Sequence, residues 1–308
     1  MHCILGYGTI GQLLAKELVD AEQSVRVVRR SNTGEAPKFD VIYANLTDLP
    51  SVRAAIAGAT VVYLVVGIEY RTNTWREQWP LVMANVISAC SEVSARLVFL
   101  DNTYLYGREI KNMTEVTPIH PCSEKGFIRA QVVIMLKKAV EKGKIDALIA
   151  RSASFYGPNA VTGFTAPMVF ARLAKRQSPF WPIFAKVRHS LSYTPDIAKA
   201  LRILGCTKEA YNDSWHLPTN SDALTGEQFS GFAAEAFGLR KPVKTLGKVT
   251  MTIGGLFSRL IRESLEMNYQ YATEYVFDST KFERRFFSAT SYADGIRETV
   301  KCTHASHN

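Results

Sequence analysis

A glycine triplet near the start of the chain is the feature that most constrains its fold. Gly6, Gly8 and Gly11 form the spacing Gly-x-Gly-x-x-Gly in the stretch MHCILGYGTIGQ, directly after a short apolar lead-in. Residues 12–19 then show the spacing of an amphipathic helix. A glycine turn between a strand and a helix lets the backbone approach a pyrophosphate at the helix N-terminus. The stretch therefore predicts a dinucleotide-binding βαβ unit.

Strand-like and helical stretches alternate through the first half of the chain. Strands are expected at 24–30, 61–66, 97–100 and 147–149, and helices at 49–56, 75–93 and 125–142. This alternation predicts an α/β fold, a Rossmann-type doubly wound parallel sheet covered by helices on both faces.

The pattern loosens after Arg151 and predicts a smaller C-terminal substrate lobe. We expect the Rossmann domain at 1–160, with 188–218 contributing back to it, and the substrate-binding lobe at 161–187 and 219–300. Phe180, Trp181 and Phe184 form either a stacking wall for the substrate or simply the core of this lobe.

Composition narrows the class of protein and of partner. The 308 residues are 47% hydrophobic and 21% charged, as in a packed α/β protein, and the longest apolar run, 59–68, is too short to span a membrane. The net charge of +9 is spread along the chain, so we expect a solvated basic surface and neither a nucleic-acid nor a membrane partner. A small-molecule substrate is expected, and homodimerisation is left open.

Cysteine and histidine usage argues against metal and disulfide sites. The five cysteines include no Cys-x-x-Cys, and the six histidines include no His-x-x-x-His pair, so we expect reduced thiols and no metal. A strand that starts at residue 2 leaves no room for a secretory signal, which predicts a cytoplasmic location.

The residues after the second expected strand favour NADP over NAD. An NAD site usually carries Asp or Glu about twenty residues after the glycines, whereas this chain has Arg29-Arg30-Ser31, which suits a 2′-phosphate. Solvated strand-end arginines are the alternative. Asn45 either bonds the adenine or is an ordinary turn residue. The remaining expected cofactor contacts are Tyr7, Thr9, Ile10, Leu46 and Val66.

Four blocks in order resemble the extended short-chain dehydrogenase/reductase superfamily, of the NAD-dependent epimerase/dehydratase type. They are Gly6-Tyr7-Gly8-Thr9-Ile10-Gly11 and the stretches at 98–107 (VFLDNTYLYG), 151–158 (RSASFYGP) and 192–198 (SYTPDIA). The resemblance implies the Rossmann fold, a nicotinamide cofactor and hydride transfer.

The resemblance also implies a catalytic set, from which this chain departs. The family's substrate-binding Ser or Thr corresponds to Asn102, and its Tyr-x-x-x-Lys pair corresponds to Lys125 and Arg129. In the related sugar-nucleotide dehydratases an acidic residue stands where this chain has Tyr104.

These departures predict a rearranged site. Asn102, Tyr104 and Tyr106 are expected to alternate along an extended strand end and to face the same side. Tyr104 would be the acid/base, with Lys125 lowering its pKa, and Asn102 would hydrogen-bond the substrate.

Two further residues complete the expected site. Arg129 would hold the nicotinamide ribose, and Ser154, which stands where the family has Asn, would contact the carboxamide or the substrate.

Two functions remain open from the sequence. The first is an NAD(P)-dependent epimerase/dehydratase-like oxidoreductase that acts on a small carbonyl, alcohol or sugar-derived substrate. The second is a non-catalytic NADP(H)-binding sensor or regulatory protein, which the loss of Tyr-x-x-x-Lys favours.

Overall fold

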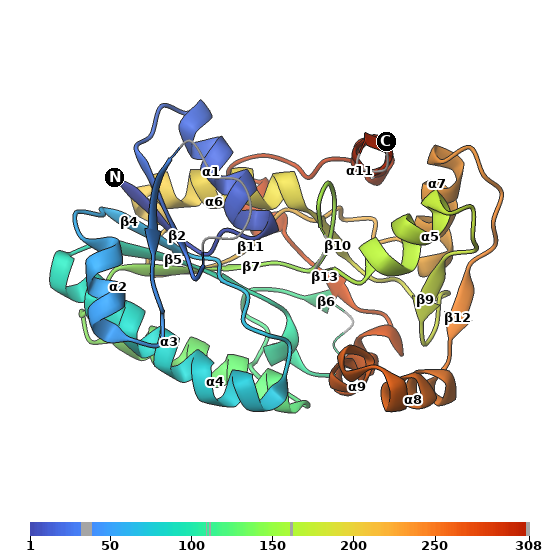
Figure 1. Cartoon of the computed structure of the whole chain (residues 1–308), viewed down its shortest axis with the longest axis horizontal. Helices are drawn as coiled ribbons and strands as arrows, with labels where there is room; N and C mark the ends of the chain where they lie inside the picture. Colours follow the sequence, from blue (N-terminus) through green and yellow to red (C-terminus); the bar gives the residue numbers. More distant parts are fainter. Residues whose placement is uncertain (32–38, 109, 111, 161–162, 306–308) are drawn as a thin grey trace. The chain divides into compact units, whose positions relative to one another are not determined.

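The computed structural model describes residues 1–31, 39–108, 110, 112–160 and 163–305 (Figure 1). The chain divides into two compact units, each built from separate stretches of sequence. Unit 1 contains 1–101, 125–151 and 198–215, and unit 2 contains 102–124, 152–197 and 216–308. The domain boundaries expected from the sequence stay a prediction.

Unit 1 is built on a seven-stranded sheet of order β11-β7-β5-β4-β1-β2-β3. Its strands are β1 (His2–Leu5), β2 (Val25–Arg29), β3 (Asp40–Tyr43), β4 (Val61–Leu64), β5 (Arg96–Asp101), β7 (Ala147–Arg151) and β11 (Ser214–His216). The pairs that join β3, β2, β1, β4, β5 and β7 are all parallel. The predicted doubly wound sheet is confirmed, and its strand order reverses between β1 and β4.

Helices cover both faces of this sheet. They are α1 (Thr9–Asp20), α2 (Leu49–Ile56), α3 (Thr72–Val93), α4 (Glu124–Glu141), α6 (Thr194–Cys206) and the short η3 (Lys208–Ala210). Figure 1 shows α1 and α6 on one face and α2, α3 and α4 on the other. In α1, Ile10, Leu14 and Leu18 recur every four residues and are buried, which gives the helix its sheet-facing stripe.

Unit 2 contains three small parallel sheets. They pair β6 (Asn112–Met113) with β13 (Val276–Phe277), β8 (Ser154–Tyr156) with β10 (Leu191–Tyr193), and β9 (Phe180–Pro182) with β12 (Lys244–Leu246). Its helices are η1 (Tyr104–Tyr106), η2 (Ala166–Phe170), α5 (Ala171–Ala174), α7 (Gly226–Ala236), α8 (Lys248–Phe257), α9 (Arg259–Ser264), η4 (Leu265–Tyr271), α10 (Thr280–Glu283) and α11 (Tyr292–Ala305).

An aromatic cluster forms the core of unit 2. Trp181 is fully buried in it together with Tyr156 and Phe229. A Cβ at Gly226 would lie 2.4 Å from the Trp181 ring, so the start of α7 must be glycine for the indole to fit. Phe184 is exposed instead. Of the two roles considered for the aromatic stretch, Trp181 takes the core role.

Within the described residues, no helix is both long enough and apolar enough to cross a membrane.

Candidate functional site

The glycine loop joins β1 to α1, and its three glycines have two different roles. Gly6 has φ +114°, and a Cβ there would lie 2.7 Å from the Cα of Val66, while a Cβ at Gly11 would lie 2.0 Å from the Gly6 carbonyl oxygen. Both glycines are therefore required by the packing of the loop itself. A Cβ at Gly8 would meet no described atom within 4 Å. The backbone at Gly8 thus borders open space.

This open space lies at the N-terminus of α1, where Gly8 is the N-cap residue. Among the described residues no side chain caps this end of α1, and the first turn of the helix carries no acidic residue. The N–H groups of a first helical turn have no intrahelical partner and bind anions readily. The loop therefore offers what a pyrophosphate needs: backbone donors, a favourable helix dipole and room for close approach.

Arg29 ends β2 beside this loop. Its guanidinium carbon lies 5.5 Å from the centre of the Tyr7 ring, and burial raises the pKa of the Tyr7 phenol. Arg30 and Ser31 are exposed. The described stretch 25–31 contains no Asp or Glu, so no carboxylate of that stretch would repel a phosphate. The sequence after it, 32–38, lies outside the described residues.

Asn45 forms the turn between β3 and α2. Its side-chain oxygen accepts hydrogen bonds from the Thr47 backbone N–H at 3.1 Å and from the Thr47 hydroxyl at 2.9 Å. The Leu46 carbonyl accepts a hydrogen bond from the Asn85 amide at 3.1 Å. Of the two roles considered for Asn45, the turn role is therefore present in the structure, and the adenine contact stays a prediction.

A buried charge network closes the carboxyl ends of β5 and β7. The Asp101 oxygen Oδ1 accepts from Arg129 Nε at 2.9 Å and from Arg129 Nη2 at 2.6 Å, and Oδ2 accepts from Arg151 Nε at 3.0 Å. All three side chains are buried. The Arg129 guanidinium also lies 4.3 Å from the Trp79 ring and 4.7 Å from the Phe99 ring. Much of the guanidinium of Arg129 is thus engaged inside unit 1, and its contact with the nicotinamide ribose stays a prediction.

Lys125 is completely buried in the first turn of α4. Its ammonium donates to the Thr72 hydroxyl at 2.8 Å and lies 4.7 Å from the centre of the Tyr70 ring. A buried ammonium requires polar or π partners. Tyr70 and Thr72 follow β4 in the sequence but were not recognised as site residues, although a Tyr-x-Thr step after a buried strand was the available signal.

The predicted arrangement of Asn102, Tyr104 and Tyr106 is wrong in one respect. β5 ends at Asp101, and the Asn102 side-chain oxygen accepts from the Tyr104 backbone N–H at 3.0 Å. This turn leads into the 3₁₀ helix η1, so the two-residue alternation of a strand does not continue. Tyr106 is buried, and its hydroxyl lies 2.5 Å from His216 Nε2. Tyr104 is half-buried, so the two tyrosines lie in different environments.

Three tyrosines from η4 and the loop after it surround Tyr104 in unit 2. Tyr275 donates its hydroxyl proton to the Thr103 carbonyl at 3.1 Å, and Tyr269 donates to the Tyr104 carbonyl at 3.5 Å. Burial, reinforced by the neighbouring Tyr104, raises the pKa of Tyr271 well above its usual range. The sequence reasoning missed this cluster, whose signal was the tyrosine-rich stretch NYQYATEY at 268–275.

Ser154 lies beside a buried histidine in unit 2. Its hydroxyl is 3.1 Å from His189 Nε2, and His189 Nδ1 is 3.2 Å from the Gln270 carbonyl oxygen. A carbonyl only accepts, so Nδ1 carries the proton and Nε2 accepts from Ser154. Burial lowers the pKa of His189 to about 4, which keeps the ring neutral. Toward any other group Ser154 therefore presents an acceptor.

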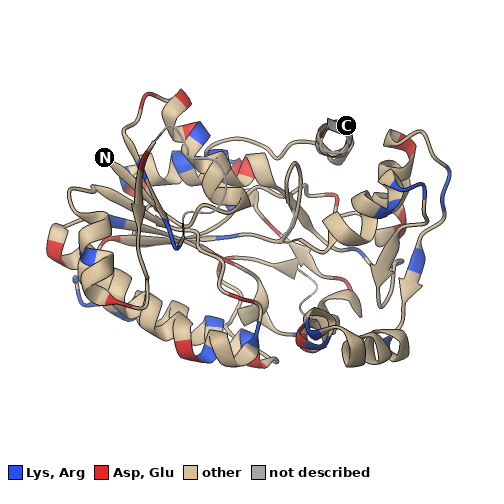
Figure 2. Ribbon diagram, in the orientation of Figure 1, with Lys and Arg blue, Asp and Glu red and all other residues tan. Residues whose placement is uncertain are grey.

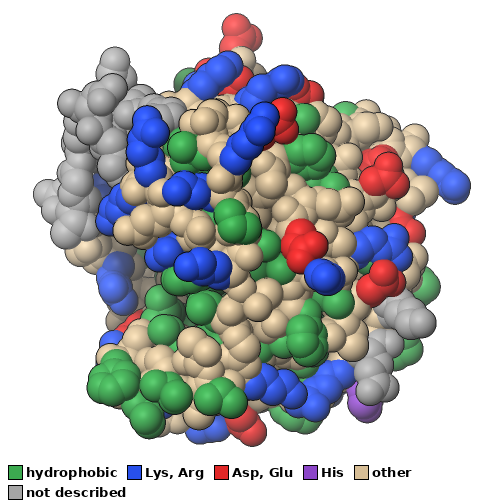
Figure 3. Space-filling view, turned by 90° about the vertical axis from the view of Figure 1, so that its right-hand side faces the viewer, with side chains coloured by type: hydrophobic (Ala, Val, Ile, Leu, Met, Phe, Trp, Pro, Cys, Tyr) green, Lys and Arg blue, Asp and Glu red, His purple; other side chains and the backbone are tan. Residues whose placement is uncertain are grey.

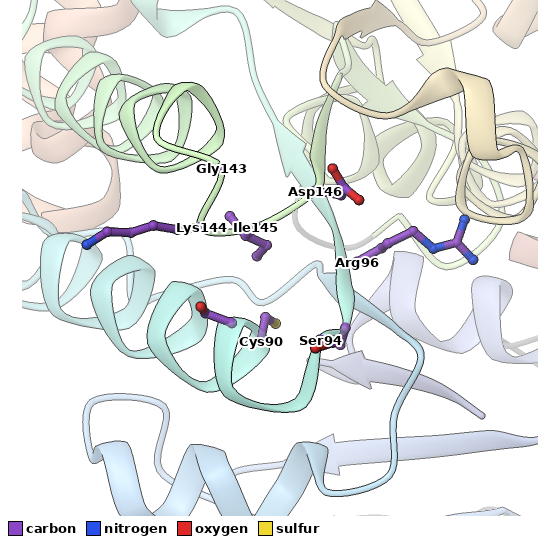
Figure 4. A pocket seen from close by; sticks show the side chains of 9 residues that line it. Cys90, Ser94, Arg96, Gly143, Lys144, Ile145 and Asp146 are labelled. Atoms are coloured by element: carbon purple, nitrogen blue, oxygen red, sulfur yellow. The ribbon is translucent and has the colours of Figure 1, made fainter.

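A surface hollow lies at the other end of the unit 1 sheet (Figure 4). It has a volume of about 190 Å³, and Arg96 and Asp146, at the amino ends of β5 and β7, line it together with Cys90 and Lys144. Ligands of doubly wound sheets bind outside the carboxyl ends of the strands. We therefore do not assign this hollow to the cofactor or the substrate.

Metal and thiol chemistry receive no support from the described residues. Among them no group of three or more His, Cys, Asp or Glu side chains is placed to hold a metal ion. All five cysteines are free thiols, and burial raises the pKa of Cys3 to about 12.

Comparisons with known proteins bear on the family and the fold. The model of the NAD dependent epimerase/dehydratase family matches residues 3–207. No curated protein matches the sequence significantly.

Solved structures share the fold at low sequence identity. The UDP-glucose 4-epimerase of Thermus thermophilus in complex with NAD is 17% identical, with a TM-score of 0.78 over 99% of this chain and 100% of that one. The UDP-N-acetylglucosamine 4-epimerase of Methanobrevibacter ruminantium is 17% identical, with a TM-score of 0.81 over 99% and 98%. The dTDP-glucose 4,6-dehydratase DesIV of Streptomyces venezuelae, with NAD and TYD bound, is 15% identical, with a TM-score of 0.80 over 100% and 98%.

Proposed function

Because the chain belongs to the NAD dependent epimerase/dehydratase family, a family of enzymes, we propose that it binds NADP along the glycine loop and acts on a nucleotide-sugar or other sugar-derived carbonyl or alcohol substrate. The observation that carries the proposal is the open space at Gly8, because Gly6 and Gly11 are explained by packing and Gly8 is not.

The residues of unit 1 fit a dinucleotide. The N-terminus of α1 would hold the pyrophosphate, and Arg29, Arg30 and Ser31 would hold a 2′-phosphate at the end of β2. The solved neighbours that name a cofactor name NAD. We favour NADP here because the described end of β2 carries two cations and no carboxylate.

The bound nicotinamide would exchange hydride with the substrate. Tyr104 is the proposed proton carrier and Lys125 its electrostatic partner, on the basis of their places in the sequence blocks. The paired Asn102 oxygen leaves the amide nitrogen as the group to donate to a substrate oxygen. Ser154 would accept a hydrogen bond, since its own proton is directed to His189. Arg129 would act mainly by fixing Asp101, directly before Asn102.

The ligands bound in two of the solved neighbours suggest the substrate class. UDP-glucose and TYD are named with two of the solved structures. We propose a nucleotide-sugar for this chain as well, because the net charge of +9 favours a diphosphate ligand.

Cofactor binding tests the first step. Gly8→Ala places a methyl group in the open space, so we expect the Kd for NADPH to rise at least about tenfold, equivalent to one lost hydrogen bond, while the melting temperature stays near wild type. Gly231→Ala is the matched control: Gly231 is an exposed position of α7, a Cβ there would meet no described atom within 4 Å, and the Kd should stay unchanged. Equal affinities for the two variants would remove the glycine loop from cofactor binding.

Turnover tests the second step. We expect the wild-type protein to oxidise NADPH, or to convert UDP-sugars or dTDP-sugars into other sugars that carry the same nucleotide. In Tyr104→Phe we expect the turnover rate to fall by about 100-fold or more at unchanged NADPH affinity. Wild-type turnover by Tyr104→Phe would exclude Tyr104 as proton carrier. Tight NADPH binding without turnover on any of these compounds would instead favour the sensor function.

A further inference from the structure

Helix α8 presents an apolar stripe on the surface of unit 2. The stripe consists of Val249, Ile253, Leu256 and Phe257, continued by Leu260 in α9, and these side chains are between 53% and 88% exposed. The four residues of α8 recur at i, i+4, i+7 and i+8, which places them within an arc of about 100° on one side of the helix. Scattered exposed apolar residues are common, but a continuous stripe marks an interaction surface.

The opposite side of α8 packs tightly against α9, so the stripe is held outward. A Cβ at Gly255 would lie 3.3 Å from the Arg262 Cα, and the Cβ of an alanine at Gly254 would lie 3.3 Å from Ile261 Cδ1. Met251 is buried on the same inner side. Two glycines and Met251 thus face the protein, while the four large apolar residues of the stripe in α8 face outward. A surface helix usually turns its large apolar side chains inward.

Basic side chains surround the stripe. Residues 239–262 contain six Lys or Arg and no Asp or Glu, and all six basic residues are exposed. They are Arg240, Lys241, Lys244, Lys248, Arg259 and Arg262. Figure 2 shows Lys and Arg from the loop before β12 into α9, where an acidic residue, Glu263, is also present. Figure 3 shows hydrophobic side chains gathered at the lower edge of one face with Lys and Arg beside them.

We propose that this basic, apolar surface of α8 and α9 docks on an anionic lipid bilayer, with α8 lying in the plane of the membrane interface. Helices that bind bilayers in this way combine an apolar side that enters the headgroup region with Lys and Arg that contact anionic lipids. The stripe supplies the first element and the six cations supply the second. The surface goes beyond the proposed enzymatic function, and it departs from the expectation, based on an even spread of charge, that the chain has no membrane partner.

Charge favours a lipid surface over a second copy of the chain. Two copies that met symmetrically through the stripe would bring the six cations of one copy close to those of the other, with Glu263 and Glu266 as the next acidic residues along the chain. An anionic bilayer satisfies both the cations and the apolar side chains at once.

Vesicle flotation tests the proposal. We expect the full-length protein to float with vesicles that contain phosphatidylglycerol, to stay behind with pure phosphatidylcholine, and to dissociate as salt is raised. Lys244→Gln/Lys248→Gln/Arg259→Gln should weaken binding roughly a hundredfold, at roughly fivefold for each cation removed. Leu256→Ser/Phe257→Ser should abolish flotation independently, because the apolar contact is lost.

Matched controls remove the same groups elsewhere. Leu81→Ser replaces a 52% exposed leucine of α3, and Lys137→Gln/Lys142→Gln/Lys144→Gln removes three cations at the end of α4 and just after it; both should float like wild type. NADPH binding, measured on every variant, reports that unit 1 is folded.

Three outcomes would overturn the proposal. They are equal binding to neutral and anionic vesicles, flotation unaffected by either set of α8 and α9 variants, and concentration-dependent self-association without flotation that Leu256→Ser/Phe257→Ser removes. The last outcome would assign the stripe to a second copy of the chain.

Discussion

Asp101→Asn is the substitution whose effect follows most directly from the structure. It removes the carboxylate that pairs with both Arg129 and Arg151 and leaves the two guanidinium groups buried. The new amide keeps one acceptor oxygen but turns its NH₂ group toward one of the two arginines, which can only donate. Breaking a buried ion pair lowers the free energy of unfolding by about 3–5 kcal/mol. Because two cations share the lost carboxylate, we expect the free energy of unfolding of this variant to fall by about 5 kcal/mol. A change of that size lowers the melting temperature of a 308-residue chain by about 8 °C.

Urea unfolding followed by tryptophan fluorescence measures this loss, because Trp79 stacks on the Arg129 guanidinium and reports on the network directly. Asp294→Asn is the matched control: its carboxylate pairs with Arg297 on the surface, and its loss should leave the urea midpoint close to that of the wild type. The double variant Asp101→Asn/Arg129→Met removes one stranded cation and should recover part of the stability. A loss below about 1 kcal/mol in Asp101→Asn alone would show that the network is not buried as described.

Two further predictions concern charge at other sites. Arg29→Ala and Arg30→Ala should weaken NADPH binding by about tenfold to a hundredfold, the value of one charge-assisted contact to phosphate, and should change NADH binding little. Calorimetric titration of both cofactors measures these affinities. Equal losses of affinity for NADPH and NADH would exclude a 2′-phosphate site. For His189, the folded pKa of about 4 lies below the unfolded value of 6.5, so the unfolded chain binds more protons between these values and stability should rise by about 3 kcal/mol from pH 4 to pH 6.5. Denaturation midpoints across this range should be flatter in His189→Phe, and an unchanged slope would show that His189 is protonated in the fold.

The sheet could be predicted from the sequence because its strands are short, buried apolar runs. The expected strand at 97–100 is found as β5 (Arg96–Asp101), and the helix expected at 125–142 is found as α4 (Glu124–Glu141). The failure at Tyr104 and Tyr106 has a local cause. The side chain of Asn102 bonds the backbone two residues later, and this turn competes with the extended conformation that a period of two assumes.

In the candidate site, features set by nearby residues were predictable from the sequence and features set by distant contacts were not. The glycine loop was predictable because its Gly-x-Gly-x-x-Gly spacing lies within six residues, although the close approach of Gly6 to Val66 depends on the fold. The partners of Lys125 and Arg129 were not, because they depend on contacts across the fold. Thr72 is 53 residues from Lys125, and Asp101 meets Arg151 only through the register of β5 and β7.

The apolar stripe was missed for a different reason. Counting charges over the whole chain hides the stretch 239–262, in which acidic residues are absent, and helical spacing alone does not say which side of α8 faces the protein. That side is decided by Gly254 and Gly255, whose small size matters only once α9 is in place.

The interleaving of the two units has a consequence for synthesis. Residues 1–101 of unit 1 are synthesised before a stretch of unit 2, and α4 and β7 follow only after that stretch. The edge strand β11 ends at His216, about two thirds of the way along the 308-residue chain. During translation, Asp101 is therefore exposed without Arg151 for the time needed to make fifty more residues. N-terminal regions generally fold as they emerge, but the buried charge network of this chain can form only late. A nascent chain arrested before residue 151 should consequently be the form most susceptible to proteases and most dependent on chaperones.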